Sequence, residues 1–214
     1  MPGLAAIYDG AFFAEWGKGN EPYVRTAEVL ARILLDEFRP ARVADLGCGC
    51  GAYSQALARE GVSVLALDGV RPPAEHAFPV PLHVQDLSAP FENSWGPFDL
   101  ALCLEVAEHV PEEFSDALLD NVTRFSDTLV LSAAPPNQGG HHHVNERPRN
   151  YWVRRLAARG FAYNRRRTGR VFEAARAIKP PLMWMAQHMA VYEKCSDPAV
   201  LGRMLPFSVR LKGA

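Results

Sequence analysis

The stretch from Val43 to Gly51, which reads Val-Ala-Asp-Leu-Gly-Cys-Gly-Cys-Gly, constrains the fold more than any other part of the chain. An apolar run over residues 42–46 predicts a buried strand, and a helical pattern over residues 52–59 follows the three alternating glycines. Glycine is needed where a chain turns sharply from strand to helix while its backbone approaches a ligand. We therefore expect a nucleotide-type cofactor site at this turn.

Asp45, two residues before the first glycine, separates two interpretations of the turn. The glycine spacing also fits the loose dinucleotide fingerprint of nicotinamide-dependent oxidoreductases, in which a pyrophosphate lies on the helix N-terminus. A carboxylate at this point would repel a pyrophosphate and attract a cationic group. S-adenosylmethionine carries an ammonium and a sulfonium group and no phosphate, so Asp45 favours this cofactor over a dinucleotide.

Three further apolar runs follow, and each contains or ends in an acidic residue at its carboxyl end. They are residues 62–68 with Asp68, residues 82–87 with Asp86, and residues 98–105 with Glu105. Asp68 lies about 20 positions beyond the glycines, where a carboxylate can hold ribose hydroxyls. Together with the glycine turn, this order of strand ends resembles class I S-adenosylmethionine-dependent methyltransferases over roughly residues 40–165.

The resemblance implies a fold and a cofactor site. The fold would be α/β, a single Rossmann-like seven-stranded sheet, mostly parallel, with helices on both faces and an antiparallel last strand. The cofactor residues would be Asp45, Gly47, Cys48, Gly49 and Gly51 at the methionine part, Asp68 and Gly69 at the ribose, and Asp86 and Leu87 at the adenine, with Leu104 and Glu105 completing the site. The implied reaction is in-line transfer of the methyl group to an acceptor, for which a hydroxyl of a small molecule or glycan is expected.

The remaining periodicity predicts how the chain is organised. Helices are expected at residues 21–38, 112–125 and 149–159, and strands at residues 128–133, 161–167 and 189–194, the last one antiparallel, with an insertion at residues 168–186 broken by Pro180 and Pro181. We expect one domain over residues 1–214. It divides into a lid and helix at 1–38, a cofactor-binding half at 40–135, an acceptor-side half at 136–194 and a tail at 195–214.

The cellular setting is expected to be the cytoplasm. No apolar run approaches the ~18 residues of a membrane span, and no signal peptide is visible. The spacing of the four cysteines suits neither disulfides nor a metal knuckle, and a reducing compartment is their natural setting.

Two groups of residues are candidates for the chemistry. Glu105, Glu108 and His109 are spaced to share one face of a helical turn. Residues 141–143 form a histidine triplet in a loop rich in proline and glycine. Histidine is the side chain best suited to remove a hydroxyl proton near neutral pH. We expect Glu108, His109 and one member of the triplet, taken as His142, to be catalytic.

The Glu-x-x-Glu-His pattern also resembles metal-assisted O-methyltransferases, namely the ubiquinone-pathway catechol enzymes and the enzymes that methylate the terminal 2′-hydroxyl of small RNAs. That resemblance implies a divalent metal held by Glu105, Glu108, His109 and His142. A metal there would lower the pKa of the acceptor hydroxyl and orient it. Many relatives with Glu-His at this position use no metal, so the sequence leaves metal use open.

The net charge of −1 hides a sharp division along the chain. Residues 1–140 hold 8 basic and 20 acidic residues, whereas residues 141–214 hold 15 basic and 4 acidic residues. We expect the basic part, including Arg165 to Arg167 and Arg170, to neutralise the acidic part within the fold or across a homodimer. An anionic acceptor or a membrane surface is the alternative. A nucleic-acid partner is disfavoured because it usually goes with a basic whole-chain pI and aromatics interleaved on a basic face, whereas the pI here is about 6.7.

Two functions of other classes stay open at this point. A nicotinamide-dependent oxidoreductase would bind NAD(P) and give Asp45 no role. A non-catalytic domain that binds S-adenosylmethionine would tolerate changes at His109 and in the triplet.

Overall fold

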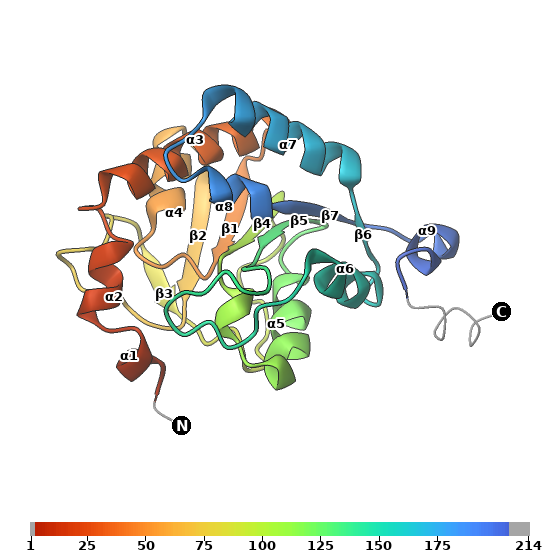
Figure 1. Ribbon diagram of the computed structural model, residues 1–214, viewed down its shortest axis with the longest axis horizontal. Helices are drawn as coiled ribbons and strands as arrows, with labels where there is room; N and C mark the ends of the chain where they lie inside the picture. The colour runs from red at the N-terminus through yellow and green to blue at the C-terminus, as the bar shows by residue number, and fades with distance from the viewer. Residues whose placement is uncertain (1–2, 206–214) are drawn as a thin grey trace.

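Within residues 3–205, which the computed structural model describes, seven strands form one sheet in the order β3-β2-β1-β4-β5-β7-β6 (Figure 1). The strands are β1 (Arg42–Leu46), β2 (Ser63–Asp68), β3 (Leu82–Val84), β4 (Leu100–Leu104), β5 (Thr128–Ser132), β6 (Phe161–Tyr163) and β7 (Ala190–Lys194). Strands β1 to β5 pair in parallel, and β7 is antiparallel to both β5 and β6. The expected Rossmann-like sheet with an antiparallel last strand is confirmed.

Helices cover both faces of the sheet. They are α1 (Leu4–Ile7), α2 (Gly10–Glu15), α3 (Glu21–Phe38), α4 (Ala52–Arg59), η1 (Ala107–His109), η2 (Glu112–Phe114), α5 (Ser115–Val122), α6 (Arg149–Ala157), α7 (Arg165–Ile178), α8 (Met183–His188) and α9 (Pro198–Gly202). Helices α3, α4, α7 and α8 pack on one face, and α5 and α6 pack on the other (Figure 1). This arrangement explains why every residue of the central strand β4 is buried and apolar.

Helix α3 has the bounds that the sequence predicts, because its start and end signals are local. The Asn20 side chain accepts a hydrogen bond from the Tyr23 N–H, which caps the helix. Leu30 and Leu34 are fully buried on its inner face. The helix ends where Arg39 adopts the left-handed conformation.

The strand expected over residues 161–167 is too long. The structure ends β6 at Tyr163, and α7 begins at Arg165. The Asn164 side chain accepts a hydrogen bond from the Arg167 N–H at 2.9 Å, so Asn164 is a helix cap and stops the strand. The first turn of a 14-residue helix therefore replaces the second half of the predicted strand.

The helix expected over residues 112–125 is divided. A 3₁₀ turn, η2, precedes α5, which ends at Val122. Phe114, expected on the apolar face, is 42% exposed, whereas Phe125 is buried beyond the helix end. The third strand is also shorter than expected, so Asp86 lies outside it and accepts a hydrogen bond from the Ser88 N–H.

The charge division is compensated in part within the fold. Arg167 and Arg170 of α7 both pair with Glu37 of α3. On the opposite face Arg155 and Arg159 of α6 pair with Asp116 of α5. These pairs join the basic second part of the chain to its acidic first part, as we expected. Each is partly exposed and contributes little alone, on the order of 0–1 kcal/mol.

All four cysteines are free, and burial raises the pKa of the Cys50 thiol to about 12. Within residues 3–205, none of the helices combines the length and apolar character that a membrane crossing requires. The tail expected at 195–214 includes α9, and its part beyond residue 205 lies outside the described residues.

Candidate active site

The glycine turn is tied to the end of β2. The N–H groups of Gly47 and Cys48 donate to the Leu67 carbonyl at 2.8 and 2.9 Å. Gly47 has a φ of 87°, and a Cβ at this position would clash with the Val106 side chain. Both the backbone conformation and the lack of space therefore require glycine here.

Asp68 closes the turn from the second strand. Its Oδ2 accepts a hydrogen bond from the Gly49 N–H at 2.8 Å, and its Oδ1 accepts one from the Val70 N–H at 3.0 Å. Burial raises the pKa of this carboxyl, and the backbone donors oppose that shift. The carboxylate is thus fixed at the carboxyl edge of the sheet, where a ligand with hydroxyl groups can reach it.

Asp45 is 3% exposed at the end of β1. Its Oδ2 accepts a hydrogen bond from the Ser54 hydroxyl at 2.6 Å. Burial raises the pKa of Asp45 to about 6, since the hydroxyl alone does not offset the loss of solvent. A cationic group of a ligand beside it would stabilise the ionised form.

Two adjoining cavities, of about 160 and 220 Å³, lie at this edge and share the glycines 47 and 49, Glu105 and His109. The expected cofactor residues divide between them. Asp68, Gly69, Asp86 and Leu87 line the smaller cavity, and Asp45, Cys48 and Leu104 line the larger one. Gly51 lines neither cavity and forms the N-cap of α4.

The expectation that Glu105, Glu108 and His109 share a helical face is wrong. Glu105 adopts a left-handed conformation, with φ of 55°, and the short helix η1 begins only at Ala107. Nevertheless the half-buried Glu105 lies beside the buried Glu108. Burial raises the pKa of Glu105 to about 7, and burial together with the charge of Glu105 raises the pKa of Glu108.

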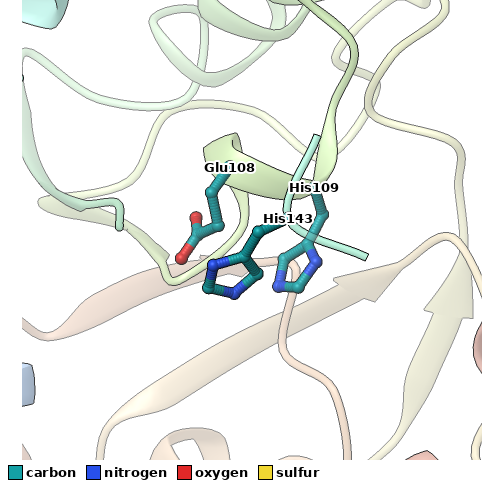
Figure 2. Close-up of side chains that lie close together, drawn as sticks. All are labelled: Glu108, His109 and His143. Carbon is teal, nitrogen blue, oxygen red and sulfur yellow. The ribbon is translucent and has the colours of Figure 1, made fainter. Parts of the chain in front are cut away.

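Glu108, His109 and His143 form a cluster in which one potential ligand atom from each side chain lies within 4.8 Å of the others (Figure 2). Glu108 is 0% exposed; its Oε1 accepts from the Ala134 N–H at 3.2 Å. In the described part of the chain, neither Oε2 of Glu108 nor Nδ1 of His109 has a hydrogen-bond partner. The buried Glu108 carboxylate therefore keeps one oxygen without a partner beside the two imidazole rings.

His143, rather than His142, is the member of the triplet that reaches this cluster. Its Nδ1 lies 3.1 Å from Oε1 of Glu146. Its ring packs on Gly140, where a Cβ would overlap it. The expected residue His142 is exposed and adopts a left-handed conformation outside the cluster, because the loop turns at this point. The neighbouring His141 contacts the Ile7 carbonyl through Nε2 at 2.7 Å.

The backbone of Glu108 fixes the loop that carries the histidine triplet. The Glu108 carbonyl accepts hydrogen bonds from the N–H groups of Val144 and Asn145 at 3.0 and 2.9 Å. Glu146 in turn accepts bonds from the Asn137 and Gly139 N–H groups. Sequence reasoning missed Glu146. Its position three residues after His143, in a loop of polar residues, was the available signal.

Helices α1 and α2 lie against the same cavities. Leu4, Tyr8 and Phe12 line the smaller cavity together with the expected cofactor residues. The Tyr8 ring makes an edge contact with His109, with 5.6 Å between centroids, and its buried hydroxyl has no partner among residues 3–205. From the far end of the chain Trp184 lines the larger cavity, so the site is assembled from segments distant in sequence.

The model of a family described as "Methyltransferase domain" matches residues 20–175. Among curated proteins, the ubiquinone biosynthesis O-methyltransferase of Xylella fastidiosa (strain M23) is 38% identical over 80 residues, which cover 34% of this chain and 32% of that protein. The enzyme of the same name from Xanthomonas campestris pv. campestris (strain B100) is 37% identical over 98 residues, covering 42% and 39%. The matches thus span about a third of the length of these relatives.

Solved structures share the fold. The Burkholderia thailandensis 1,6-didemethyltoxoflavin-N1-methyltransferase, crystallised with bound 1,6-didemethyltoxoflavin and S-adenosylhomocysteine, has a TM-score of 0.58 at 19% identity, covering 90% of this chain and 89% of that one. The magnesium protoporphyrin IX methyltransferase of Synechocystis PCC 6803 with bound S-adenosylhomocysteine has a TM-score of 0.55 at 22% identity, covering 76% and 90%. At these identities the likeness shows the architecture of the sheet and its helices.

Proposed function

The chain belongs to the methyltransferase domain family, and we propose that it transfers the methyl group of S-adenosylmethionine to a hydroxyl group of a small molecule, a glycan included. The observation that carries the choice of a hydroxyl is the cluster of Glu108, His109 and His143 beside the cofactor cavities. A hydroxyl is a weak nucleophile until its proton is removed, whereas a free amine needs little base. A set of histidine and carboxylate groups at the acceptor side has a task only in the first case.

The cofactor would lie across both cavities. Asp45, with the turn at residues 47–49, would face the cationic methionine part, and Asp68 would accept hydrogen bonds from the ribose. Asp86 and Leu87 would border the adenine. The methyl group would then point over Glu105 toward the cluster. Positioning the acceptor in line with the sulfonium is the main contribution that such an enzyme makes.

A divalent cation is part of this proposal. Glu108, His109 and His143 fit one, because their potential ligand atoms lie within 4.8 Å of one another and Oε2 of the buried Glu108 has no partner among residues 3–205. When bound, the cation would lower the pKa of the acceptor hydroxyl. Glu146 would orient the His143 ring through Nδ1, which leaves Nε2 facing the site. This arrangement replaces the set with Glu105 and His142 that the sequence suggested.

The two histidines would not be equivalent in proton transfer. Burial lowers the pKa of His109 to about 4, so its ring is neutral at pH 7 and a poor proton acceptor. A base works best with a pKa near the working pH. His143 is oriented instead by Glu146, whose Oε1 lies 3.1 Å from Nδ1 of the ring. We therefore propose that, without a cation, Nε2 of His143 receives the acceptor proton and His109 forms a neutral wall of the site. With the cation bound, both ring nitrogens of His143 would be occupied, and the acidified hydroxyl would release its proton to solvent.

A nitrogen acceptor is the second candidate. The similar Burkholderia enzyme is named as an N1-methyltransferase, so the fold accommodates this chemistry. It would leave Glu108, His109 and His143 without a proton to remove. We also propose a cytoplasmic location, because four free thiols suit a reducing compartment.

The test uses labelled S-adenosylmethionine with parallel panels of catechols, sugars and nitrogen heterocycles. We expect label on oxygen, with its transfer lost in His143→Ala and kept in His142→Ala, a matched change in the same loop. Transfer to nitrogen at equal rates in both variants would exclude the proposed acceptor. Binding of NAD(P), with no binding of S-adenosylhomocysteine, would exclude the cofactor.

A further inference from the structure

A third cavity, of about 90 Å³, lies where β5 and β7 meet the start of α6, and it shares no lining residue with the two cofactor cavities. Its polar lining consists of Arg147, Arg149, Trp152, His188 and Tyr192, and it includes no aspartate or glutamate. All five side chains can donate hydrogen bonds. Its chemistry therefore differs from that of the acidic cofactor edge.

Two of these donors are buried and unpaired. Trp152 is 2% exposed and Tyr192 is 0% exposed. Neither the Trp152 Nε1 nor the Tyr192 hydroxyl has a hydrogen-bond partner among residues 3–205. Leaving a buried donor unpaired costs about 1–3 kcal/mol, so two donors on one small cavity indicate a polar occupant.

One of the two arginines of this cavity carries a positive charge that is not neutralised by a carboxylate, since Arg147 pairs with Glu112 and Arg149 does not form such a pair within residues 3–205. Arg149 donates to the Gln187 carbonyl at 2.6 Å, and no carboxylate of the described chain forms an ion pair with it. Arg149 is also the first residue of α6, a nine-residue helix with no side-chain cap and no acidic residue in its first turn. The N-terminus of a helix favours an anion, and the Arg149 guanidinium adds to this preference.

We infer that this cavity binds a small oxyanion, either a phosphate or a carboxylate group. Its volume is several times the roughly 10–15 Å³ that one water needs, which leaves room for a group of a few heavy atoms. His188 joins the site to the catalytic side, because its Nδ1 lies 3.9 Å from Oε1 of Glu105. The inference does not depend on which atom accepts the methyl group.

The experiment titrates the full chain with inorganic phosphate and, in parallel, with acetate by calorimetry at constant ionic strength. We expect saturable binding of at least one anion. Arg149→Gln and Tyr192→Phe should each weaken it at least several-fold. Tyr192→Phe removes only the unpaired hydroxyl, so the fold should keep its thermal stability. The anion that binds more tightly shows whether the cavity takes a phosphate or a carboxylate group.

Arg154→Gln is the matched control, since Arg154 lies on the same helix, is exposed and does not line the cavity. It should leave the affinity unchanged. Heats no larger than those of chloride would overturn the inference, because ordered waters would then satisfy the donors. An equal loss of affinity in Arg154→Gln and Arg149→Gln would also overturn it. That result would mean that the anion is attracted by the overall positive charge of α6 and does not bind in the cavity.

Discussion

The cofactor side and the acceptor side of the site are built in different ways. The cofactor side consists of strand ends and turns between residues 45 and 87, and its contacts, such as Gly49 to Asp68, join neighbouring strands. The acceptor side combines an N-terminal helix, the end of β4, a long loop and a late insertion. The cofactor side is therefore specified by a local pattern, whereas the acceptor side exists only once the whole chain has folded.

The strongest test of this difference is His143→Ala. We expect turnover to fall by about 10²–10⁴-fold, as for loss of a general base, while affinity for S-adenosylhomocysteine stays within a few-fold. Steady-state kinetics and calorimetry measure the two quantities. If affinity for S-adenosylhomocysteine fell together with turnover, His143 would contribute to cofactor binding as well, and the proposed division between cofactor side and acceptor side would be wrong. His142→Ala should behave like the wild type.

Removal of divalent cations should affect only the acceptor side. After treatment with a chelator we expect turnover to fall by roughly 100-fold, since Glu108, His109 and His143 would lose the cation that they bind together. Turnover should recover when Mg²⁺ or Mn²⁺ is added. Cofactor affinity, measured in the same samples, should not change. Full activity in chelator would leave His143 as a base and remove the cation from the proposal.

Asp68→Ala should affect the cofactor side instead. It removes the carboxylate held by the Gly49 and Val70 N–H groups, and we expect cofactor affinity to weaken by about 1–3 kcal/mol. Calorimetry with S-adenosylhomocysteine measures the change. Asp127→Ala, at an exposed position, is the control. An unaltered affinity in Asp68→Ala would contradict the proposed ribose contact.

The last prediction concerns stability rather than activity, and it uses the Asp45→Asn variant. The pKa of Asp45 is raised to about 6 by burial, so the stability that its protonated form contributes is present below pH 4 and is lost as pH rises through 6. Without added cofactor, the Asn variant should gain roughly 3 kcal/mol relative to the wild type between pH 4 and pH 8, since the shift is about two pKa units. Denaturant unfolding across this range measures the gain. If the difference in unfolding free energy between the two proteins did not change with pH, the raised pKa of Asp45 would be refuted.

The sequence predicted the elements around the glycine turn well because each signal there is short-range. The bounds of β1, α3 and α4 match the expectation, and Asp45 and Asp68 lie where the strand pattern put them. On the acceptor side, helical spacing suggested a shared face for Glu105 and Glu108. The left-handed Glu105 removed that face, yet burial still brought the carboxylates together.

The choice between His142 and His143 could not be made from sequence. It depends on the bonds that the Glu108 carbonyl forms with Val144 and Asn145, which fix the direction in which the loop turns. Asn164 likewise ended a strand through a side-chain cap that competes with the apolar pattern. Both wrong predictions have the same cause: one or two hydrogen bonds decided the local conformation against the pattern of apolar and polar residues.

The contact between His141 and the Ile7 carbonyl has a consequence for exchange of the cofactor. It joins the loop to α1, which with α2 covers the cavity lined by Asp68 and Asp86. Of the two helices, only Phe13 is buried, so moving this end of the chain breaks few contacts. Exchange of the cofactor would therefore require α1 and α2 to move away from this cavity.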